Sequence, residues 1–269
     1  MNKPIKKILV TGVAGFLGSH LAEKLSELKY KVVGVDNMVG GYKDNIPPNI
    51  DFHNFDCCDL NKMNKIMKDV DVVYHCAATA HEGLSVFSPN IITKNIFQSS
   101  VTVFTASIKA NVKKIIYCSS MARYGSIEPP FKESSSPMPQ DPYGIAKYAS
   151  EKVLENLCKT HNVRYTVVVP HNIIGPYQKY DDPFRNVLSI MINRNIQGLP
   201  SIIYGDGSQK RCFSYVDDVL FCLENVLENK LTDSEVINIG PDEEIITIKE
   251  LSEMVNNVTG SNLEPIYYE

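Results

Sequence analysis

The fold of this chain follows from one stretch near its beginning, Lys7-Ile8-Leu9-Val10-Thr11-Gly12-Val13-Ala14-Gly15-Phe16-Leu17-Gly18-Ser19-His20. An apolar run stops at the first of three glycines, and an amphipathic segment, residues 21–25, follows the third. This order predicts a buried strand, a tight turn and a helix, which together are the first half of a βαβ unit. Glycines at these intervals permit a sharp turn, close approach of a pyrophosphate and tight packing of the helix on the strand. The helix N-terminus would offer free N–H groups to phosphates.

The next predicted strand distinguishes a dinucleotide site from a tight turn that binds nothing. Residues 31–35 are largely apolar and end at Asp36, eighteen residues after Gly18. A carboxylate at that position accepts hydrogen bonds from the adenosine ribose hydroxyls and repels a 2′-phosphate. No arginine adjoins Asp36. We therefore expect NAD, rather than NADP, as the cofactor.

Composition narrows the class of protein. The chain has 269 residues, of which 43% are hydrophobic, enough for one large domain or a domain with a smaller lobe. A net charge of -4 argues against nucleic acid as a partner. Every apolar run is shorter than the roughly 20 residues that span a bilayer. Residues 1–7 lead straight into the first strand, so we expect no signal peptide.

The seven cysteines are odd in number and scattered, a pattern that favours reduced thiols over a disulfide framework. We therefore expect a cytoplasmic protein. Cys57 and Cys58 are adjacent and lack the spacing of metal ligands, so we expect no metal site.

Strand-like and helix-like segments alternate over the first two-thirds of the chain, which is typical of α/β proteins with a parallel, doubly wound sheet. We expect strands at residues 50–55, 71–78, 114–118 and 164–169, and helices at 60–67, 90–110 and 143–161. Ligands of such sheets bind beyond the carboxyl ends of the strands. One shared site is expected because many polar or small residues follow strand ends: Gly12, Asp36, Asp56, Ala77, Ser119, Ser120 and Pro170.

The regular alternation stops after Val169, where a stretch rich in proline begins. We expect residues 1–169 to form an NAD-binding, Rossmann-like domain. Residues 170–211 and 241–269 would form a smaller C-terminal, substrate-binding lobe. The segment between them, residues 212–240, is expected to pack back on the larger domain with a helix at 215–227 and a strand at 236–240. A final helix is expected at 247–258.

Tyr143 and Lys147 stand at positions i and i+4, and so share one face of the predicted helix. An ammonium lowers the pKa of a neighbouring phenol, which suits the phenol for proton exchange near neutral pH. For the bare spacing, an unrelated surface tyrosine and lysine would be the simpler interpretation. Context favours the catalytic one, because the hydroxyl of Ser119 or Ser120 at a strand end could reach the same substrate oxygen.

Together these motifs resemble those of the extended short-chain dehydrogenase/reductase family, in its sugar-nucleotide epimerase/dehydratase branch, and UDP-glucose 4-epimerase-like members in particular. The family's glycine motif matches residues 11–18, and its His-x-Ala-Ala motif matches residues 75–78. Its Ser-Ser motif corresponds to residues 118–125, and its signature pair to Tyr143 and Lys147. Further matches at 170–176, 204–207 and 211–219 extend the resemblance over nearly the whole chain.

The resemblance implies roles for individual residues. Catalysis would rest on Ser120, Tyr143 and Lys147. The nucleotide sugar would be bound by Ser120, Asn172, Tyr204 and Arg211, whose hydroxyl, amide, aromatic and guanidinium groups suit sugar, base and diphosphate. NAD would be bound by Gly12, Gly15, Phe16, Leu17, Gly18, Asp36, Asn37, Asp56, Cys57, Ala77, Ala78, Thr79, Asn95, Tyr143, Lys147 and Pro170.

The function implied by the resemblance is NAD-dependent epimerisation of a nucleotide sugar, with a UDP-hexose 4-epimerase acting through a transient 4-keto intermediate as the expected case. Dehydratases of this branch place Asp-Glu after the catalytic hydroxyl, where this chain has Met121-Ala122. Decarboxylases tend to place a glutamate there, which Ala122 cannot replace. The alternatives are an oxidoreductase that consumes NADH on a keto-sugar nucleotide and a non-catalytic, NAD-binding regulatory protein.

We expect a homodimer, because residues 90–110 and 143–161 carry more apolar positions than one helical stripe needs. In the family the corresponding helices pair into an intersubunit four-helix bundle. Relatives also continue with a second phosphate-binding arginine beyond the region that matches Glu269. From this we expect either weakened diphosphate binding or a native chain that continues past Glu269.

Overall fold

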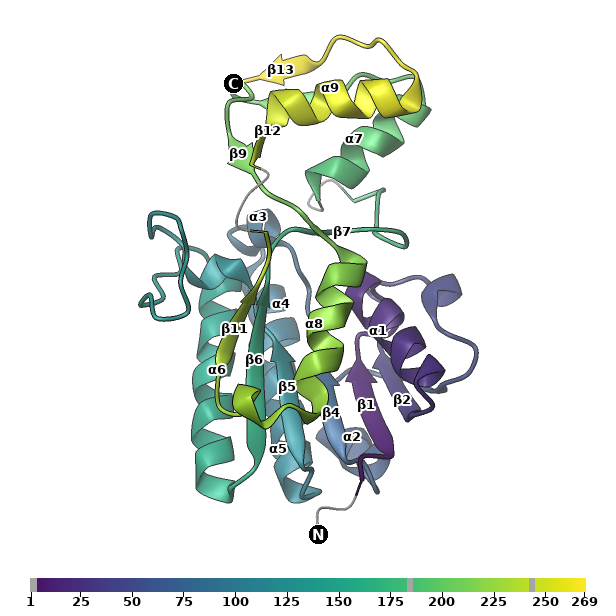
Figure 1. Ribbon diagram of the computed structural model, residues 1–269, viewed down its shortest axis with the longest axis vertical. Coiled ribbons are helices and arrows are strands. Elements are labelled where there is room, and N and C mark those ends of the chain that lie inside the picture. Colours follow the sequence, from purple (N-terminus) through teal and green to yellow (C-terminus); the bar gives the residue numbers. More distant parts are fainter. Residues whose placement is uncertain (1–3, 183–185, 242–244) are drawn as a thin grey trace.

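A computed structural model describes residues 4–182, 186–241 and 245–269 (Figure 1). Its centre is a seven-stranded parallel sheet with strand order β11-β6-β5-β4-β1-β2-β3, which confirms the predicted α/β, Rossmann-like class. Residues 1–3, 183–185 and 242–244 of the expected domains lie outside the described residues. The strands are β1 (Lys7–Thr11), β2 (Lys31–Asp36), β3 (Asp51–Asn54), β4 (Val72–His75), β5 (Lys114–Cys118), β6 (Arg164–Pro170) and β11 (Val236–Ile239).

Helices cover both faces of the sheet, because its central strands are apolar on both sides. On one face, α1 (Phe16–Glu27) packs beside α8 (Val216–Glu228) over a core that includes Ile8, Leu21 and Val219. On the other face, α2 (Leu60–Ile66), α5 (Ser99–Lys109) and α6 (Pro142–His161) pack side by side. The strand order reverses direction between β1 and β4, the point at which such sheets bind ligands.

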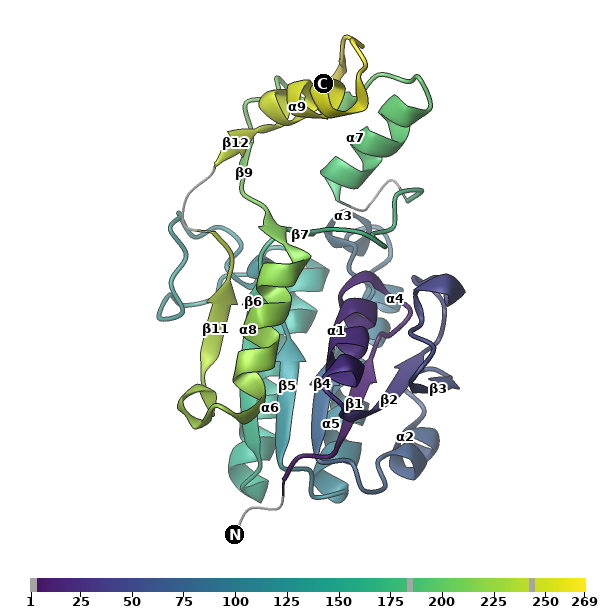
Figure 2. The same ribbon diagram turned by 45° about the vertical axis from the view of Figure 1, so that its right-hand side comes forward.

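A smaller group of elements lies beyond the carboxyl ends of the strands, at the top of Figure 1 and in the turned view of Figure 2. Its helices α7 (Val187–Ile196) and α9 (Ile248–Thr259) share a core of Met191, Ile203, Leu251 and Val255. Its short strands pair as β8 (Ile202–Tyr204) with β13 (Ile266–Tyr268), and as β9 (Lys210–Arg211) with β12 (Ile246–Thr247).

The chain crosses between the two parts three times, after β6, before α8 and after β11. β7 (Ile173–Ile174) and β10 (Ser214–Tyr215) form a parallel pair at the crossing, and β11 then lies parallel to β6 at the sheet edge. The exact division at residues 169, 211 and 240 stays a prediction.

Two predicted elements have different limits in the structure. The strand expected at 71–78 ends at His75, because the Ala77 amide turns to donate to the Thr11 hydroxyl at 3.1 Å. The helix expected at 90–110 is divided into α4 (Pro89–Thr93), a π-helical turn η2 (Lys94–Gln98) and α5. At the start of α5 the Ser99 and Ser100 hydroxyls donate to carbonyls of that turn, those of Asn95 and Ile96, an alternative to the regular ladder.

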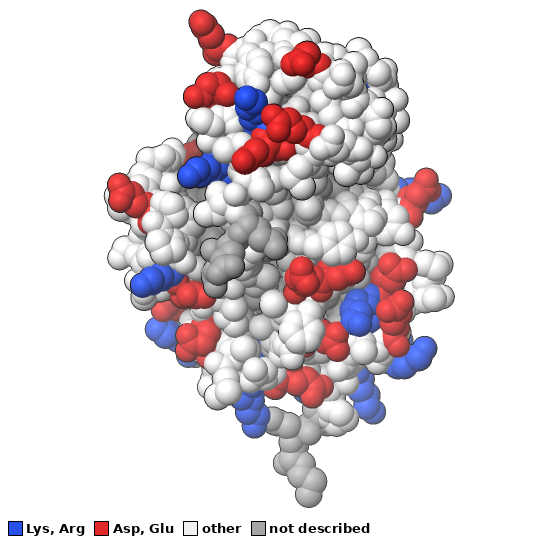
Figure 3. Space-filling model, turned by 45° about the horizontal axis from the view of Figure 1, so that its top comes forward, with Lys and Arg blue, Asp and Glu red and all other residues white. Residues whose placement is uncertain are grey.

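Short helices complete the described chain: η1 (Lys43–Asn45), α3 (Glu82–Ser85), η3 (Met121–Arg123) and η4 (Lys230–Thr232). Charged side chains of both signs are scattered over the face shown in Figure 3, with Lys and Arg interspersed among Asp and Glu.

Candidate active site

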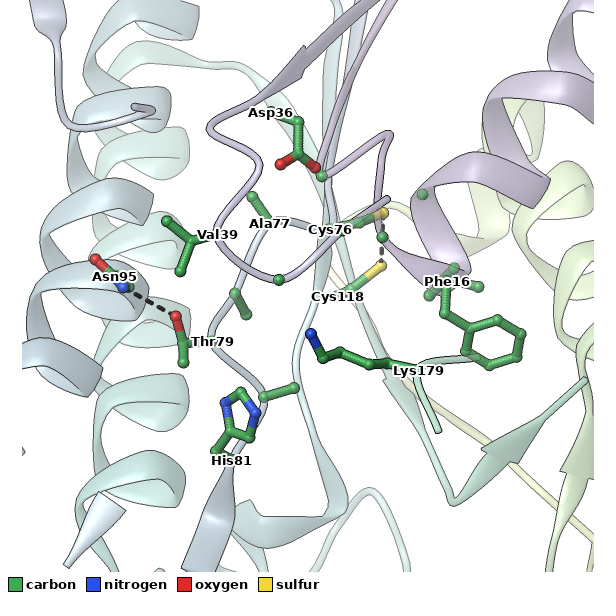
Figure 4. Close-up of a pocket in the computed structure, with 18 of the residues that line it drawn as sticks. Phe16, Asp36, Val39, Cys76, Ala77, Thr79, His81, Asn95, Cys118 and Lys179 are labelled. Carbon is green, nitrogen blue, oxygen red and sulfur yellow. Dashed lines mark hydrogen bonds between the residues drawn. The ribbon is translucent and has the colours of Figure 1, made fainter. Parts of the chain in front are cut away.

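A cavity of about 460 Å³ opens at the carboxyl ends of the strands, below the smaller lobe. Its walls come from the loops after β1, β2, β4, β5 and β6, together with α6 and the η2 turn. Figure 4 shows the labelled residues converging on it from these separate elements. All sixteen residues predicted to bind the cofactor line this cavity, and so do Ser120 and Asn172.

The glycine turn forms the wall nearest to β1. Gly12 adopts a φ of +81°, a conformation that glycine adopts without strain, and its amide donates to the Val35 carbonyl at 2.7 Å. A Cβ on Gly18 would lie 2.1 Å from the Gly12 carbonyl oxygen. The first turn of α1 can therefore approach the strand end only because that position lacks a side chain. Backbone N–H groups at the start of α1 have no partner within the helix and can receive an anion.

Asp36 ends β2 and faces this turn. Its carboxylate accepts hydrogen bonds from the amides of Ala14 at 3.0 Å and Met38 at 2.7 Å. These two bonds fix the buried carboxylate at the cavity wall. Its oxygens can accept further hydrogen bonds there, for example from two neighbouring hydroxyls of a ligand. Asp56, at the end of β3, accepts from the Cys58 amide at 2.8 Å, which orients the loop that carries Cys57.

His75 at the end of β4 has a structural role. Its ring contacts the Thr11 hydroxyl at 2.8 Å and the Ser100 hydroxyl at 2.9 Å. Burial lowers its pKa to about 3, so the ring is neutral and joins β1, β4 and α5. In the loop after β4, the Thr79 hydroxyl accepts from the Asn95 amide of η2 at 2.9 Å, and this bond holds both side chains against the cavity (Figure 4).

The predicted catalytic pair lies at the start of α6, one helical turn apart. Asp141 caps this helix by accepting from the Gly144 amide at 2.9 Å, which fixes where the first turn begins. Tyr143 and Lys147 are both buried and line the cavity. The Lys147 ammonium donates to the Cys118 carbonyl at 2.7 Å, and burial lowers the pKa of Lys147 to about 8.

Ser120 follows β5 and lines the same cavity as this pair. Its hydroxyl oxygen accepts from the Ala122 amide at 3.2 Å and caps η3. A Cβ on Gly144 would lie 2.6 Å from the Ala122 carbonyl oxygen, so a glycine is required for α6 to pack this closely on the serine loop. Sequence reasoning did not single out Gly144. A glycine next to Tyr143 in the first turn of a predicted helix could have indicated that this turn packs closely on another segment.

A buried ion pair supports the serine loop from behind. The Ser119 hydroxyl donates a short hydrogen bond to one oxygen of Glu151, and Arg123 binds the other oxygen at 3.0 Å. Burial raises the pKa of Glu151, and the guanidinium of Arg123 opposes that shift. Sequence reasoning missed both residues, although Glu151 continues the face of α6 that carries Tyr143 and Lys147.

The residues predicted to bind the nucleoside diphosphate lie in different places. Asn172 lines the cavity and donates to the Cys212 carbonyl at 3.1 Å. Tyr204 on β8 is 71% exposed, and Arg211 on β9 is also exposed. Neither residue lines the cavity. Arg211 is nevertheless close to Glu82, which does line it: burial raises the pKa of Glu82, and the positive charge of Arg211 opposes that rise.

Charged side chains that the sequence did not single out line the end of the cavity nearest the lobe. The His81 ring contacts the Asp182 carboxylate at 2.7 Å, and Lys179 lies 3.6 Å from Asp181. Figure 4 shows His81 and Lys179 in the cavity. The adjacent Tyr42 hydroxyl donates to Asp181 at 2.6 Å. The His81–Asp182 and Tyr42–Asp181 contacts join loops more than a hundred residues apart in sequence, and no local pattern predicts them.

Comparisons with known proteins agree with this geometry. The model of the NAD dependent epimerase/dehydratase family matches residues 8–240. The chain is 35% identical to a putative UDP-glucose 4-epimerase of Methanocaldococcus jannaschii, covering 97% of this chain and 85% of that protein. It is 32% identical to a UDP-N-acetyl-alpha-D-glucosaminuronate decarboxylase of Bacillus cytotoxicus, covering 97% and 83%. A crystal structure of UDP-glucose 4-epimerase with UDP-glucose from Thermotoga maritima superposes with a TM-score of 0.93 at 36% identity, covering 97% and 85%.

Proposed function

Because the chain belongs to the NAD-dependent epimerase/dehydratase family, we propose that it inverts the configuration at C4 of a UDP-hexose. It is an NAD-dependent nucleotide-sugar epimerase, and its relatives include enzymes named for UDP-glucose and for an N-acetylated UDP-sugar acid. One observation carries the proposal most directly. Ser120, Tyr143 and Lys147 line one cavity, and positions 121 and 122 carry Met and Ala.

The lining residues fit NAD. The close approach of Gly18 to Gly12, which a side chain at position 18 would prevent, sets the N-terminus of α1 against the end of β1, an arrangement that suits a pyrophosphate there. Asp36 would accept from the adenosine ribose hydroxyls, and Asp56 with Cys57 would flank the adenine. When bound, NAD supplies a hydride acceptor that can return the same hydride to the opposite face of the sugar.

In this proposal Tyr143 removes the proton from the 4-hydroxyl and later returns it to the same oxygen. Ser120 hydrogen-bonds that oxygen and fixes its distance from the phenol. Lys147 holds the nicotinamide ribose, and its positive charge favours the phenolate form of Tyr143. The Lys147 ammonium keeps its position because the Cys118 carbonyl accepts one of its protons.

Binding of the nucleoside diphosphate is assigned to Asn172, Tyr204 and Arg211. The proposal requires the last two to turn toward the cavity from β8 and β9, since both side chains are exposed. Anchoring the remote diphosphate would hold the oxidised sugar while its reacting end turns over, so that binding energy far from C4 supports catalysis. The proposed substrate-binding lobe therefore comprises residues 170–211 and 241–269, with residues 1–169 binding NAD and 212–240 packed on them.

Elimination of water or carbon dioxide is the less favoured chemistry, because both reactions in this family use acidic residues after the catalytic hydroxyl. Met121 and Ala122 form η3 immediately after Ser120 and have no proton to exchange. A reductase acting on a keto-sugar nucleotide would consume NADH, whereas an epimerase regenerates its NAD in each turnover. A regulatory protein would bind NAD without turning over any sugar.

A panel of UDP-, GDP-, dTDP- and CDP-hexoses, followed by proton NMR without added NADH, tests the proposal. We expect inversion at C4 of a UDP-hexose and a loss of about 10²–10⁴-fold in turnover for Tyr143→Phe. Dehydration or decarboxylation products, or a requirement for NADH, would contradict it. Equal or better affinity of the cofactor-free protein for NADP than for NAD would contradict the role of Asp36.

We also propose a homodimer that uses α4 and α6. These helices pack together and expose apolar side chains, with Ile91 57% and Ile145 52% exposed. Burying such side chains against a second copy would remove apolar surface from water. Light scattering at micromolar concentration should give the mass of two chains, and Ile91→Glu with Ile145→Glu should give one. A single-chain mass for the wild type would contradict the dimer.

A cytoplasmic location is proposed on the strength of the seven free thiols. Within the described residues, no helix combines the length and apolar character that crossing a bilayer requires. Fractionation of the native cells, with the protein recovered outside the cytoplasmic fraction, would contradict the proposed location.

A further inference from the structure

Two thiols meet on the floor of the cofactor cavity. The sulfur atoms of Cys76 and Cys118 lie 3.4 Å apart, and Figure 4 shows them pointing toward one another between the glycine turn and the serine loop. The register of β4 and β5 explains the contact. His75 pairs with Tyr117, so the next residues along the two parallel strands, Cys76 and Cys118, lie opposite each other.

This geometry allows a covalent bond between the sulfurs. Neighbouring strands lie about 4.8 Å apart, which is within the Cα separation of roughly 4.4–6.8 Å that disulfides span. Both cysteines are free, and both line the cavity, so a small reagent can reach them through the cofactor entrance. The sulfurs would have to approach each other by about 1.4 Å to reach a bond length of about 2.05 Å.

The two thiols differ in reactivity. The hydrogen bond between the two thiols raises the pKa of Cys76 and lowers that of Cys118. The positive charge of Lys147, whose ammonium binds the Cys118 carbonyl, lowers the pKa of the Cys118 thiol further. Cys118 is thus the sulfur that carries thiolate character, and thiolate is the nucleophilic form.

We propose that Cys76 and Cys118 are a redox-active dithiol. Hydrogen peroxide oxidises it to a disulfide in the cofactor-free protein, and the disulfide then opposes cofactor binding. The Cys118 thiolate attacks one peroxide oxygen, the O–O bond breaks, and hydroxide leaves with a proton as water. The Cys76 sulfur next attacks the Cys118 sulfenic acid, the S–O bond breaks, and a second water leaves. Two thiols lose two electrons and two protons in total, and the peroxide is reduced to two waters.

The disulfide would distort both halves of the cofactor site. Cys76 precedes Ala77, whose Cα and amide nitrogen lie only 3.0 Å from where a Gly12 Cβ would be. Pulling Cys76 toward β5 therefore moves backbone that packs against the glycine turn. On the other side, the Cys118 carbonyl accepts the proton that positions Lys147. Bound cofactor would in turn cover the dithiol and protect it from peroxide. The inference requires the cofactor cavity but no particular sugar substrate.

The test treats the cofactor-free protein with a small excess of hydrogen peroxide. We expect two of the seven thiols to be lost, a disulfide-linked peptide pair containing Cys76 and Cys118 by mass spectrometry, and NAD affinity weakened by about tenfold or more. Dithiothreitol should restore both thiols and the affinity. Saturation with NAD before the peroxide should preserve all seven thiols.

Variants identify the pair. Cys76→Ser and Cys118→Ala should each leave NAD affinity the same before and after peroxide, while Cys222→Ser on α8 should respond as the wild type does. Retention of seven thiols by the wild type, or a disulfide between other cysteines, would overturn the proposal. An oxidised pair with unchanged NAD affinity would also overturn it. None of these readouts depends on sugar turnover, so failure of the proposed epimerase activity would be seen separately.

Discussion

Replacing Glu151 with glutamine should strongly destabilise the protein. The side chains of Glu151 and Arg123 are each only 5% exposed, and they meet at 3.0 Å behind the serine loop. In Glu151→Gln the amide is nearly the same size as the carboxylate, but the guanidinium loses its counter-charge. Within the described residues, the Nε and Nη1 atoms of Arg123 are buried and have no hydrogen-bond partner, so no second side chain replaces the lost charge.

The magnitude follows from the burial of the pair. Removing one partner of a buried ion pair costs about 3–5 kcal/mol, because the other charge remains desolvated. That is a large share of the roughly 5–15 kcal/mol that stabilises a folded domain. Contacts of the Arg123 guanidinium with the rings of Tyr124 at 5.2 Å and Tyr148 at 5.8 Å remain in the variant and reduce the loss in part.

A matched control lies one helical turn away. Glu155 forms solvent-accessible ion pairs with Lys152 at 2.9 Å and Lys159 at 3.0 Å, and such pairs contribute about 0.2–1 kcal/mol. Equilibrium unfolding in urea at pH 7 should therefore place Glu155→Gln near the wild type and Glu151→Gln well below it. Combining Arg123→Met with Glu151→Met should recover most of the loss, because no charge is then buried. Equal stability of the two glutamine variants would refute the reasoning.

Three further outcomes are expected. In Gly18→Ala the added Cβ would lie 2.1 Å from the Gly12 carbonyl oxygen. Overpacking of this kind costs about 1–3 kcal/mol, so NAD binding should weaken by about tenfold or more. Gly198→Ala should leave NAD titrations unchanged, because Gly198 does not line the cavity and the strain of an alanine at its φ of +73° stays local. NAD affinity should fall as pH rises from about 7 to 9, because burial lowers the Lys147 pKa to about 8 and the ammonium is lost above it; Lys147→Met should abolish this slope. Tyr143→Phe should retain nucleotide affinity in calorimetry while turnover collapses, and normal turnover would contradict its role.

The sequence predicted those parts of the fold and site that depend on local patterns. Gly12, Gly15 and Gly18 share one turn, and Asp36 ends the next apolar strand, so spacing alone indicated that they face one ligand. The i and i+4 spacing placed Tyr143 and Lys147 on one helical face, but their assignment as a catalytic pair came from the nearby Ser119-Ser120 strand end and from the family resemblance. The confirmed sheet followed from the alternation of strand and helix patterns.

Other features depend on register and on contacts between distant segments. The meeting of Cys76 with Cys118 requires the exact pairing of β4 with β5. The contact between His81 and Asp182 joins two loops whose course no periodicity specifies. The pairing of β8 with β13 involves three residues from each strand, too few to produce a recognisable pattern. The π-helical turn within the predicted helix at 90–110 could not be predicted either. The Ser99 and Ser100 hydroxyls bond carbonyls of that turn, but serines also occur in regular helices.

The fate of the hydrogen at C4 tests the central claim most directly. UDP-galactose carrying deuterium at C4 would be incubated with the purified protein in ordinary water, without added NADH, and the products followed by NMR. We expect UDP-glucose that retains deuterium at C4, because the hydride removed from the sugar returns to the same carbon while Tyr143 exchanges only the hydroxyl proton. Hydrogen from water at C4, or no inversion at C4, would contradict the proposed reaction.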